Sequence, residues 1–143
     1  MSKLIVIRMP CSLLISRFGF RLSACRWFSE IAFHKLIEKP GGLPEPRLVV
    51  YAIGNPLYAQ PILQNNRFAA YSIPFRLLIA EKHDRNGTIV TYHLPSSIMG
   101  HPDGANTLIV KRQTKILDER ITRLVRKIVS VSLILCVIHG ANA

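Results

Sequence analysis

The chain has few cysteines, few acidic residues and no apolar run long enough to cross a bilayer. Cys11, Cys25 and Cys136 are odd in number, widely spaced and without a C-x-x-C pair, which argues against a disulfide framework and a zinc site. The C-terminal apolar run 128–138 has eleven residues, whereas a spanning helix requires ~20. No clustered carboxylates or nucleophile–base–orienter set stands out, so the sequence predicts no catalytic residues, no cofactor and no metal.

The charge is unevenly distributed along the chain. Nineteen Lys and Arg residues against eight acids give a net charge of +11. Residues 1–39 and 111–143 each hold seven basic residues against two acids, whereas residues 40–110 hold five against four. A nucleic-acid-binding protein more often carries basic and aromatic residues along one folded face. The pattern therefore argues against a nucleic-acid partner and assigns the positive charge to the two ends.

The N-terminal third is open to three interpretations. A length of 143 residues with 49% apolar residues suits one domain with its own core. Within it, periodicity predicts a strand at 3–8, a short helix at 11–18, a strand at 18–24 and a helix at 27–39. Alternatively, residues 1–28 are a targeting segment, because they are Arg- and Ser-rich and lack acids, or a divergent N-terminus without settled structure. A secretory signal fits less well, because Pro10 and Arg8 break the apolar stretch early. The location is not assigned, with the cytoplasm slightly favoured.

The central part of the chain gives the clearest pattern. Residues 47–53 are apolar on both alternating faces, which is typical of a central strand. The strand runs into Gly54-Asn55-Pro56, a turn whose proline can open a short helix at 57–65, which Pro61 is expected to interrupt or delay. Residues 73–81 and 88–93 form a hairpin, and Asn86-Gly87 supplies the positive φ angles of its turn. Residues 95–106 are predicted to be a loop.

A long helix is predicted to start near residues 105–108 and to pack on the sheet. Its apolar stripe consists of Val110, Leu117, Ile121, Leu124 and Ile128. The basic pair Arg126-Lys127 then precedes the apolar run 128–138. One interpretation buries this tail on the domain or in a dimer interface, because so short a run is usually a core segment. The alternative is a membrane-peripheral protein held by its basic, apolar tail.

Several features between residues 47 and 95 occur in an order typical of one family. They are Leu48-Val49-Val50-Tyr51 running into Gly54-Asn55-Pro56, then Pro61, Gln64, Ile73-Pro74, Asn86-Gly87, and Tyr92 with Pro95 three residues later. This stretch resembles domain of unknown function family 302, which comprises small bacterial and archaeal proteins. The resemblance implies a two-layer α+β fold similar to the TATA-binding-protein-like class, and usually a homodimer. Its mainly antiparallel sheet and long C-terminal helix on one face follow the order strand-helix-four strands-helix.

The resemblance divides the chain into a divergent segment 1–28, a family-like domain 29–128 and an apolar tail 129–143. The family has no settled activity, so it implies no catalytic residues. The candidate ligand-binding residues are Asn55, Gln64 and Arg67 near one end of the sheet, with Tyr92 and His93 at the end of the hairpin. The alternative is that Gly54, Asn55 and Pro56 only form a turn.

The predicted function is a non-catalytic ligand-binding or interaction module that acts as a homodimer, with an unknown small-molecule ligand. Two alternatives stay open. One is the membrane-peripheral protein held by the C-terminal tail. The other is an enzyme of unknown reaction with its site near the Gly54-Asn55-Pro56 turn.

Overall fold

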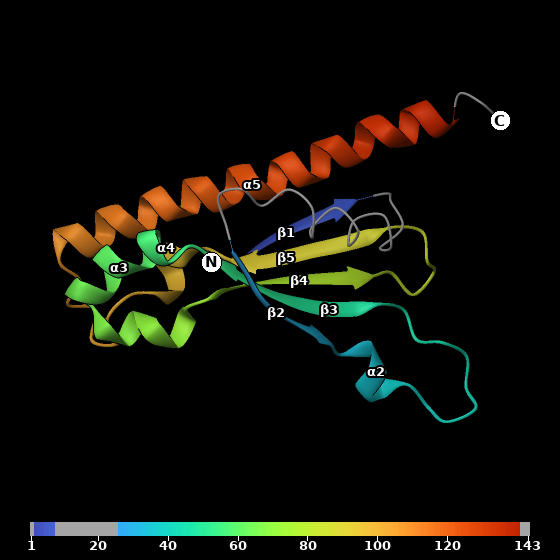
Figure 1. The fold of residues 1–143 in the computed structure, drawn as a ribbon, viewed down its shortest axis with the longest axis horizontal. Coiled ribbons are helices and arrows are strands. Elements are labelled where there is room, and N and C mark those ends of the chain that lie inside the picture. The colour runs from blue at the N-terminus through green and yellow to red at the C-terminus, as the bar shows by residue number, and fades with distance from the viewer. Residues whose placement is uncertain (1, 8–25, 141–143) are drawn as a thin grey trace.

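A five-stranded antiparallel sheet forms the centre of the protein (Figure 1). The computed structural model describes residues 2–7 and 26–140. The strands are β1 (Ser2–Ile7), β2 (Arg26–Ala32), β3 (Leu48–Gly54), β4 (Phe75–Glu81) and β5 (Thr88–His93). Their order across the sheet is β1-β5-β4-β3-β2, so that β1 and β2 form the two edges.

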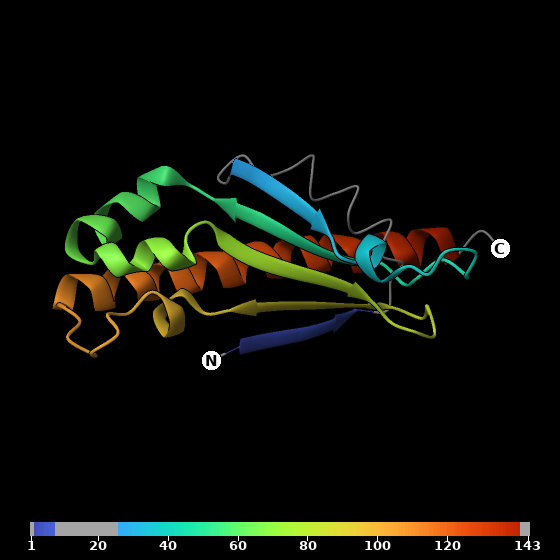
Figure 2. The same ribbon diagram turned by 90° about the horizontal axis from the view of Figure 1, so that it is seen from below.

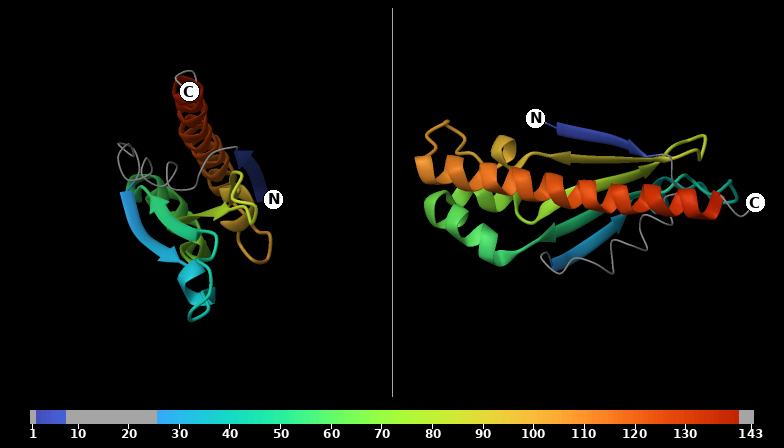
Figure 3. Two further views of the ribbon diagram at one scale, coloured as in Figure 1. Left: turned by 90° about the vertical axis from the view of Figure 1, so that its right-hand side faces the viewer. Right: turned by 90° about the horizontal axis from the view of Figure 1, so that it is seen from above.

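The helices cover one face and one end of this sheet. They are α2 (His34–Ile37), α3 (Pro56–Asn65), the 3₁₀ helix η1 (Arg67–Ser72), α4 (Pro95–Ile98) and α5 (Leu108–Gly140). Helix α5 crosses one face, while α3 and α4 lie at the end of the sheet where β3 ends (Figures 1 and 3). The predicted two-layer α+β fold with a long C-terminal helix is confirmed.

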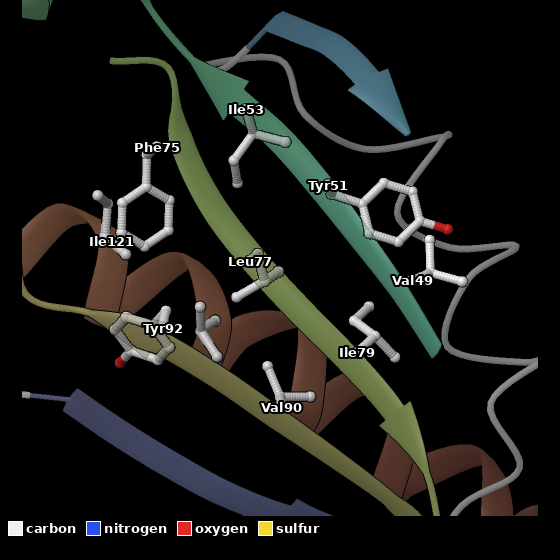
Figure 4. Close-up of a cluster of buried hydrophobic side chains, with 10 residues drawn as sticks. Val49, Tyr51, Ile53, Phe75, Leu77, Ile79, Val90, Tyr92 and Ile121 are labelled. Atoms are coloured by element: carbon white, nitrogen blue, oxygen red, sulfur yellow. The ribbon is translucent and has the colours of Figure 1, made fainter. Parts of the chain in front are cut away.

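The core lies between the sheet and α5 and follows from strand alternation. Side chains along a strand point to opposite faces in turn, so every second residue of β3, β4 and β5 can face the helix. The buried cluster consists of Val49, Tyr51, Ile53, Phe75, Leu77, Ile79, Val90, Tyr92, Ile121 and Val125 (Figure 4). The rings of Phe75 and Tyr92 meet edge to face, with centroids 5.9 Å apart. Alternation therefore settles which face of each central strand packs on α5.

The helix predicted at 27–39 is wrong. Residues 26–32 form edge strand β2, which pairs with β3 and shifts register between Trp27 and Ser29. This bulge breaks the strict two-residue alternation that identifies a strand from sequence. Only His34–Ile37 is helical, and the Leu48 N–H donates to His34 Nδ1 (3.4 Å). The apolar residues are spaced as in a helix, but pairing with β3 makes residues 26–32 a strand.

Other predicted elements are confirmed, with corrections at the turns. The strand predicted at 3–8 is β1, whereas the helix at 11–18 and the strand at 18–24 lie outside the described residues. In the hairpin loop the positive φ angles belong to Arg85 (55°) and Gly87 (122°), not to Asn86. Asn86 instead donates its N–H to Asp84 Oδ1 (3.0 Å). The predicted loop 95–106 begins with the short helix α4.

Helix α5 begins at Leu108, as predicted, but continues to Gly140. Its predicted stripe faces the core: Val110 and Ile121 are buried, and Leu117, Leu124 and Ile128 are partly buried. The contacts of α5 with the core include Val129, and toward its C-terminus the helix rises away from the sheet (Figures 1 and 3). Among the described residues, no helix is both long and apolar enough to cross a membrane. The membrane-peripheral alternative and the three-part division of the chain stay predictions.

Replacing Leu77 by alanine should lower the free energy of unfolding by about 2–5 kcal/mol, because the side chain is fully buried between β4 and α5 and leaves a cavity. Urea denaturation followed by circular dichroism measures the loss. Leu36→Ala is the matched control, since Leu36 is 75% exposed on α2 and should cost about 0.5 kcal/mol or less. Equal losses in the two variants would contradict the described core.

Candidate functional site

A cavity of about 720 Å³ opens between α3, η1 and the ends of β3 and β4. We call it the α3 pocket. Most of its described lining is apolar: Phe28, Gly54, Pro56, Ala59, Leu63, Ile73, Pro74, Phe75, Met99 and Leu117. The remaining described lining residues are Asn55, Tyr58, Gln60, Gln64 and Arg67. The pocket is therefore an apolar hollow with polar groups on one helix and on the first residue of η1.

Local sequence explains how the chain turns into α3 at this point. Asn55 has extended backbone angles (φ −133°) and caps the helix, because its Oδ1 accepts a hydrogen bond from the Leu57 N–H (3.0 Å). Pro56 occupies the first turn, where its missing N–H costs nothing. The helix continues through Pro61 and ends at Asn65. The predicted turn is thus a helix start, and the short helix predicted at 57–65 is confirmed.

Asn66 joins the pocket wall to the segment that follows α4. It is 5% exposed and lies between α3 and η1. Its Oδ1 accepts from the Phe68 N–H (3.1 Å), and its Nδ2 donates to the Met99 carbonyl (3.0 Å). The Ser72 hydroxyl makes a second link by donating to the Ile98 carbonyl (2.9 Å). These bonds fix η1 against the chain around Met99.

The floor of the pocket belongs to a small second core, which reaches the cavity through Met99. Ile62, Ala69 and Met99 are buried there, and Leu117 of α5 packs against them. On the opposite wall, Gly54 lies beside the Phe28 ring of β2, and a Cβ added at Gly54 would meet that ring at an ordinary contact distance of 3.5 Å. Helix α5 also holds α3, because the Arg120 guanidinium lies 4.0 Å from the centre of the Tyr58 ring. Four separate parts of the chain therefore build the cavity.

Arg67 is the only Lys, Arg, Asp, Glu or His among the described lining residues. It is the first residue of η1 and is exposed. Its guanidinium makes no hydrogen bond or ion pair with the described part of the chain. The pocket thus carries one positive charge at its edge and no described negative charge.

The structure brings together three of the five candidate residues. Asn55, Gln64 and Arg67 line the α3 pocket. The Tyr92 ring instead lies in the core under α5, with its hydroxyl 3.5 Å from Thr122 Oγ1. His93 is exposed and lines a hollow on the opposite face of the sheet. A shared role for all five in binding stays a prediction.

Sequence reasoning missed the walls that come from distant parts of the chain. Phe28 reaches the pocket because β2 pairs with β3, which the mistaken helix at 27–39 concealed. Met99 lay in a predicted loop, and Leu117 was assigned only to the stripe that packs on the sheet. The two glutamines four residues apart, Gln60 and Gln64, were the available signal, because such residues share one face of a helix.

No group of three or more His, Cys, Asp or Glu residues that could hold a metal ion occurs within residues 2–7 and 26–140. His101 and Asp103 form a pair, with His101 Nδ1 3.6 Å from Asp103 Oδ2. A pair on a loop provides too few ligands for a protein metal site of ordinary coordination.

Comparison with known proteins identifies the family. The family model described as "Domain of unknown function DUF302" matches residues 23–128. The chain belongs to this family. The resemblance predicted from residues 47–95 is thereby confirmed, and the match extends to both sides of that stretch. The family has no assigned function, so membership adds no activity to the site.

A solved structure supports the same fold. It is the crystal structure of an uncharacterized conserved DUF302 protein from Bacillus stearothermophilus, with a TM-score of 0.70 and 13% sequence identity. The likeness covers 92% of this chain and 97% of the other. At this identity it shows the fold alone. A comparison with curated proteins found no match.

Asn66→Ala should lower the free energy of unfolding by about 1–3 kcal/mol, because it leaves the Met99 carbonyl and the Phe68 N–H without their partner. Its neighbour provides the control: Asn65 is exposed, its Nδ2 donates to the Pro61 carbonyl (2.9 Å), and Asn65→Ala should cost about 0.5 kcal/mol. Urea denaturation of both variants measures the difference. If Asn65→Ala proves the more damaging, the described role of Asn66 is wrong.

Proposed function

We propose that this DUF302 protein binds a small, mostly apolar molecule in the α3 pocket and does not transform it. The observation that carries the proposal is the cavity itself. Ligand sites are typically clefts of about 300–1,000 Å³ with apolar walls and a few polar groups that orient the ligand. The α3 pocket has a volume of about 720 Å³, ten apolar or glycine lining residues and a small set of polar ones.

The chemistry of the lining favours binding over catalysis. General acid–base and nucleophilic catalysis require a titratable group or nucleophile within hydrogen-bond reach of the substrate. The described lining contains no His, Cys, Ser, Thr, Asp, Glu or Lys, and its one tyrosine, Tyr58, has its ring against the Arg120 guanidinium. Asn55, the centre of the enzyme alternative, already uses its side-chain oxygen to cap α3. These features support a site that holds and orients its ligand.

Leu63→Trp should weaken binding, because the larger side chain occupies part of the α3 pocket and reshapes its apolar wall. The readout is the ¹³C-methyl signal of Met99, which lines the cavity and is one of three methionines in the chain. Met99→Leu assigns the signal, and a library of small apolar fragments provides the probes. In the wild type, fragments that bind should shift the Met99 signal.

Leu57→Trp is the matched control for this experiment. Leu57 is on the same helix but is 73% exposed and does not line the pocket, so binding should be unchanged. Two results would contradict the proposal. One is that no fragment shifts the Met99 signal in the wild type, and the other is that Leu63→Trp binds fragments as well as Leu57→Trp does.

A second proposal concerns the face of the sheet opposite α5, which we call the far face. In Figure 2 the strands lie in front of α5, and no described helix crosses their middle. The far face carries Leu4, Ile31, Phe33, Val50, Ala52, Leu78 and Thr91, and a hollow of about 500 Å³ lies on it. Leu4 is 64% and Ile31 is 48% exposed. We propose that a second copy of the chain covers this face and forms a homodimer.

The size of the far face supports a second copy rather than a small molecule. Five strands about 4.8 Å apart and about 20 Å long give a flat face of about 500 Å². This is of the same order as the ~800 Å² of accessible surface that each partner buries in a stable interface. Two sheets pack face to face about 10 Å apart through apolar side chains of this kind.

Leu78→Asp should convert the proposed dimer to a monomer, because it places a carboxylate in the middle of the far face. Sedimentation velocity measures the mass, and circular dichroism checks that the variant is folded. Leu36→Asp, on exposed α2, should leave the dimer intact. A monomeric wild type would rule out the dimer, and a dimeric Leu78→Asp variant would show that the interface lies elsewhere.

A further inference from the structure

We infer that the ligand of the α3 pocket is a small apolar monocarboxylate, with its carboxylate at Arg67 and its apolar body in the cavity. This inference rests on the proposed ligand-binding function and names the chemical class of the ligand. It follows from the position of the single charged residue in the described lining, from the partners of the other polar groups and from the apolar floor.

Arg67 is held at the edge of the pocket by its neighbours. It directly follows Asn66, whose side chain is bonded both to the Phe68 N–H and to the Met99 carbonyl. The backbone of Arg67 is therefore fixed, while its guanidinium makes no bond to the described residues. A guanidinium presents parallel N–H donors that match the two oxygens of a carboxylate. An anion at this position meets no described acidic lining residue.

Two other positive centres near the pocket are already engaged. The N-terminus of α3 could attract an anion, but its first N–H groups have partners. The Leu57 N–H donates to Asn55 Oδ1, and the N–H groups of Tyr58 and Ala59 donate to the Asn55 carbonyl. The Arg120 guanidinium lies against the Tyr58 ring. These contacts leave Arg67 as the anion-binding group of the pocket.

The amides and the floor define the rest of the ligand. Gln60 and Gln64 lie four residues apart on α3, so both can donate to oxygens near Arg67. Below them the walls are the side chains of Leu63, Phe75 and Met99. A second charge or a hydroxyl-rich body would lose its hydration against these walls without gaining partners. The pocket therefore suits a ligand with one charged group at the edge and a hydrocarbon body inside the cavity.

Octanoate, octan-1-ol and octylammonium test this inference, because they share one chain and differ in head-group charge. Titration below the micelle concentrations of octanoate and octylammonium and below the solubility limit of octan-1-ol, followed by the Met99 methyl signal, gives each dissociation constant. We expect octanoate to bind at least about tenfold more tightly than the alcohol, and the ammonium more weakly than the alcohol, because only the carboxylate is attracted by Arg67.

Arg67→Gln should weaken octanoate binding about tenfold and leave octan-1-ol binding unchanged, since the exposed residue contributes its charge and not the apolar walls. The control is Arg76→Gln. Arg76 is an exposed arginine that lines the hollow on the far face, so all three affinities should be unchanged.

The outcomes separate this inference from the proposed function. If octan-1-ol or octylammonium binds as tightly as octanoate, or if Arg67→Gln leaves octanoate binding unchanged, the ligand is not chosen by its charge and the inference is wrong. The same conclusion follows if library fragments bind and octanoate does not. In these cases the pocket is still a ligand site. If neither fragments nor octanoate shift the Met99 signal, this inference and the proposed ligand-binding function are both wrong.

Discussion

The packing of alternate residues of the central strands against α5 determines most of this structure. One set of side chains from β3, β4 and β5 forms the core with α5, and the intervening set forms the far face. The same packing places the end of β3 and the start of β4 beside Leu117 and Ile121 of α5, while the first turns of α5 extend over α3 (Figure 1). The α3 pocket and the far face are thus two results of one arrangement. The first is a hollow at the end of the layered core, and the second is the surface that the single long helix does not cover.

The pocket depends further on a few polar contacts outside this core. Asn55 starts α3, and Asn66 ties η1 to the chain after α4 through hydrogen bonds to backbone groups. Asp118 of α5 does the same for α4, because its carboxylate accepts from the N–H and the hydroxyl of Ser96 (2.9 and 2.6 Å). Short helices with little apolar surface need such links, because their own packing contributes little stability. The walls of the cavity are therefore positioned by hydrogen bonds, whereas its floor is positioned by burial.

The sequence predicts those parts of the fold in which local pattern and tertiary contact agree. Strand β3, helix α3, the hairpin and the start of α5 all follow from alternation, proline position or helical spacing. Strand β2 does not follow from the sequence, because its bulge interrupts the alternation and its apolar residues recur at near-helical spacing. The candidate site shows the same limit. Asn55, Gln64 and Arg67 are close in sequence and in space. Phe28 and Met99 instead reach the pocket through contacts between parts of the chain that are distant in sequence. Strand alternation alone predicts that Tyr92 and His93 face opposite sides of the sheet, and they do.

The register shift between Trp27 and Ser29 also affects how copies of this chain can meet. Strand β2 is an edge, and a regular edge offers a row of free N–H and C=O groups on which another chain can add a strand. The bulge interrupts the regular spacing of that row and increases the local twist. Open-ended addition of strands, the route to fibres, is therefore discouraged at this edge. Face-to-face contact between two sheets, by contrast, ends with a closed dimer, because each far face is covered once one partner has bound.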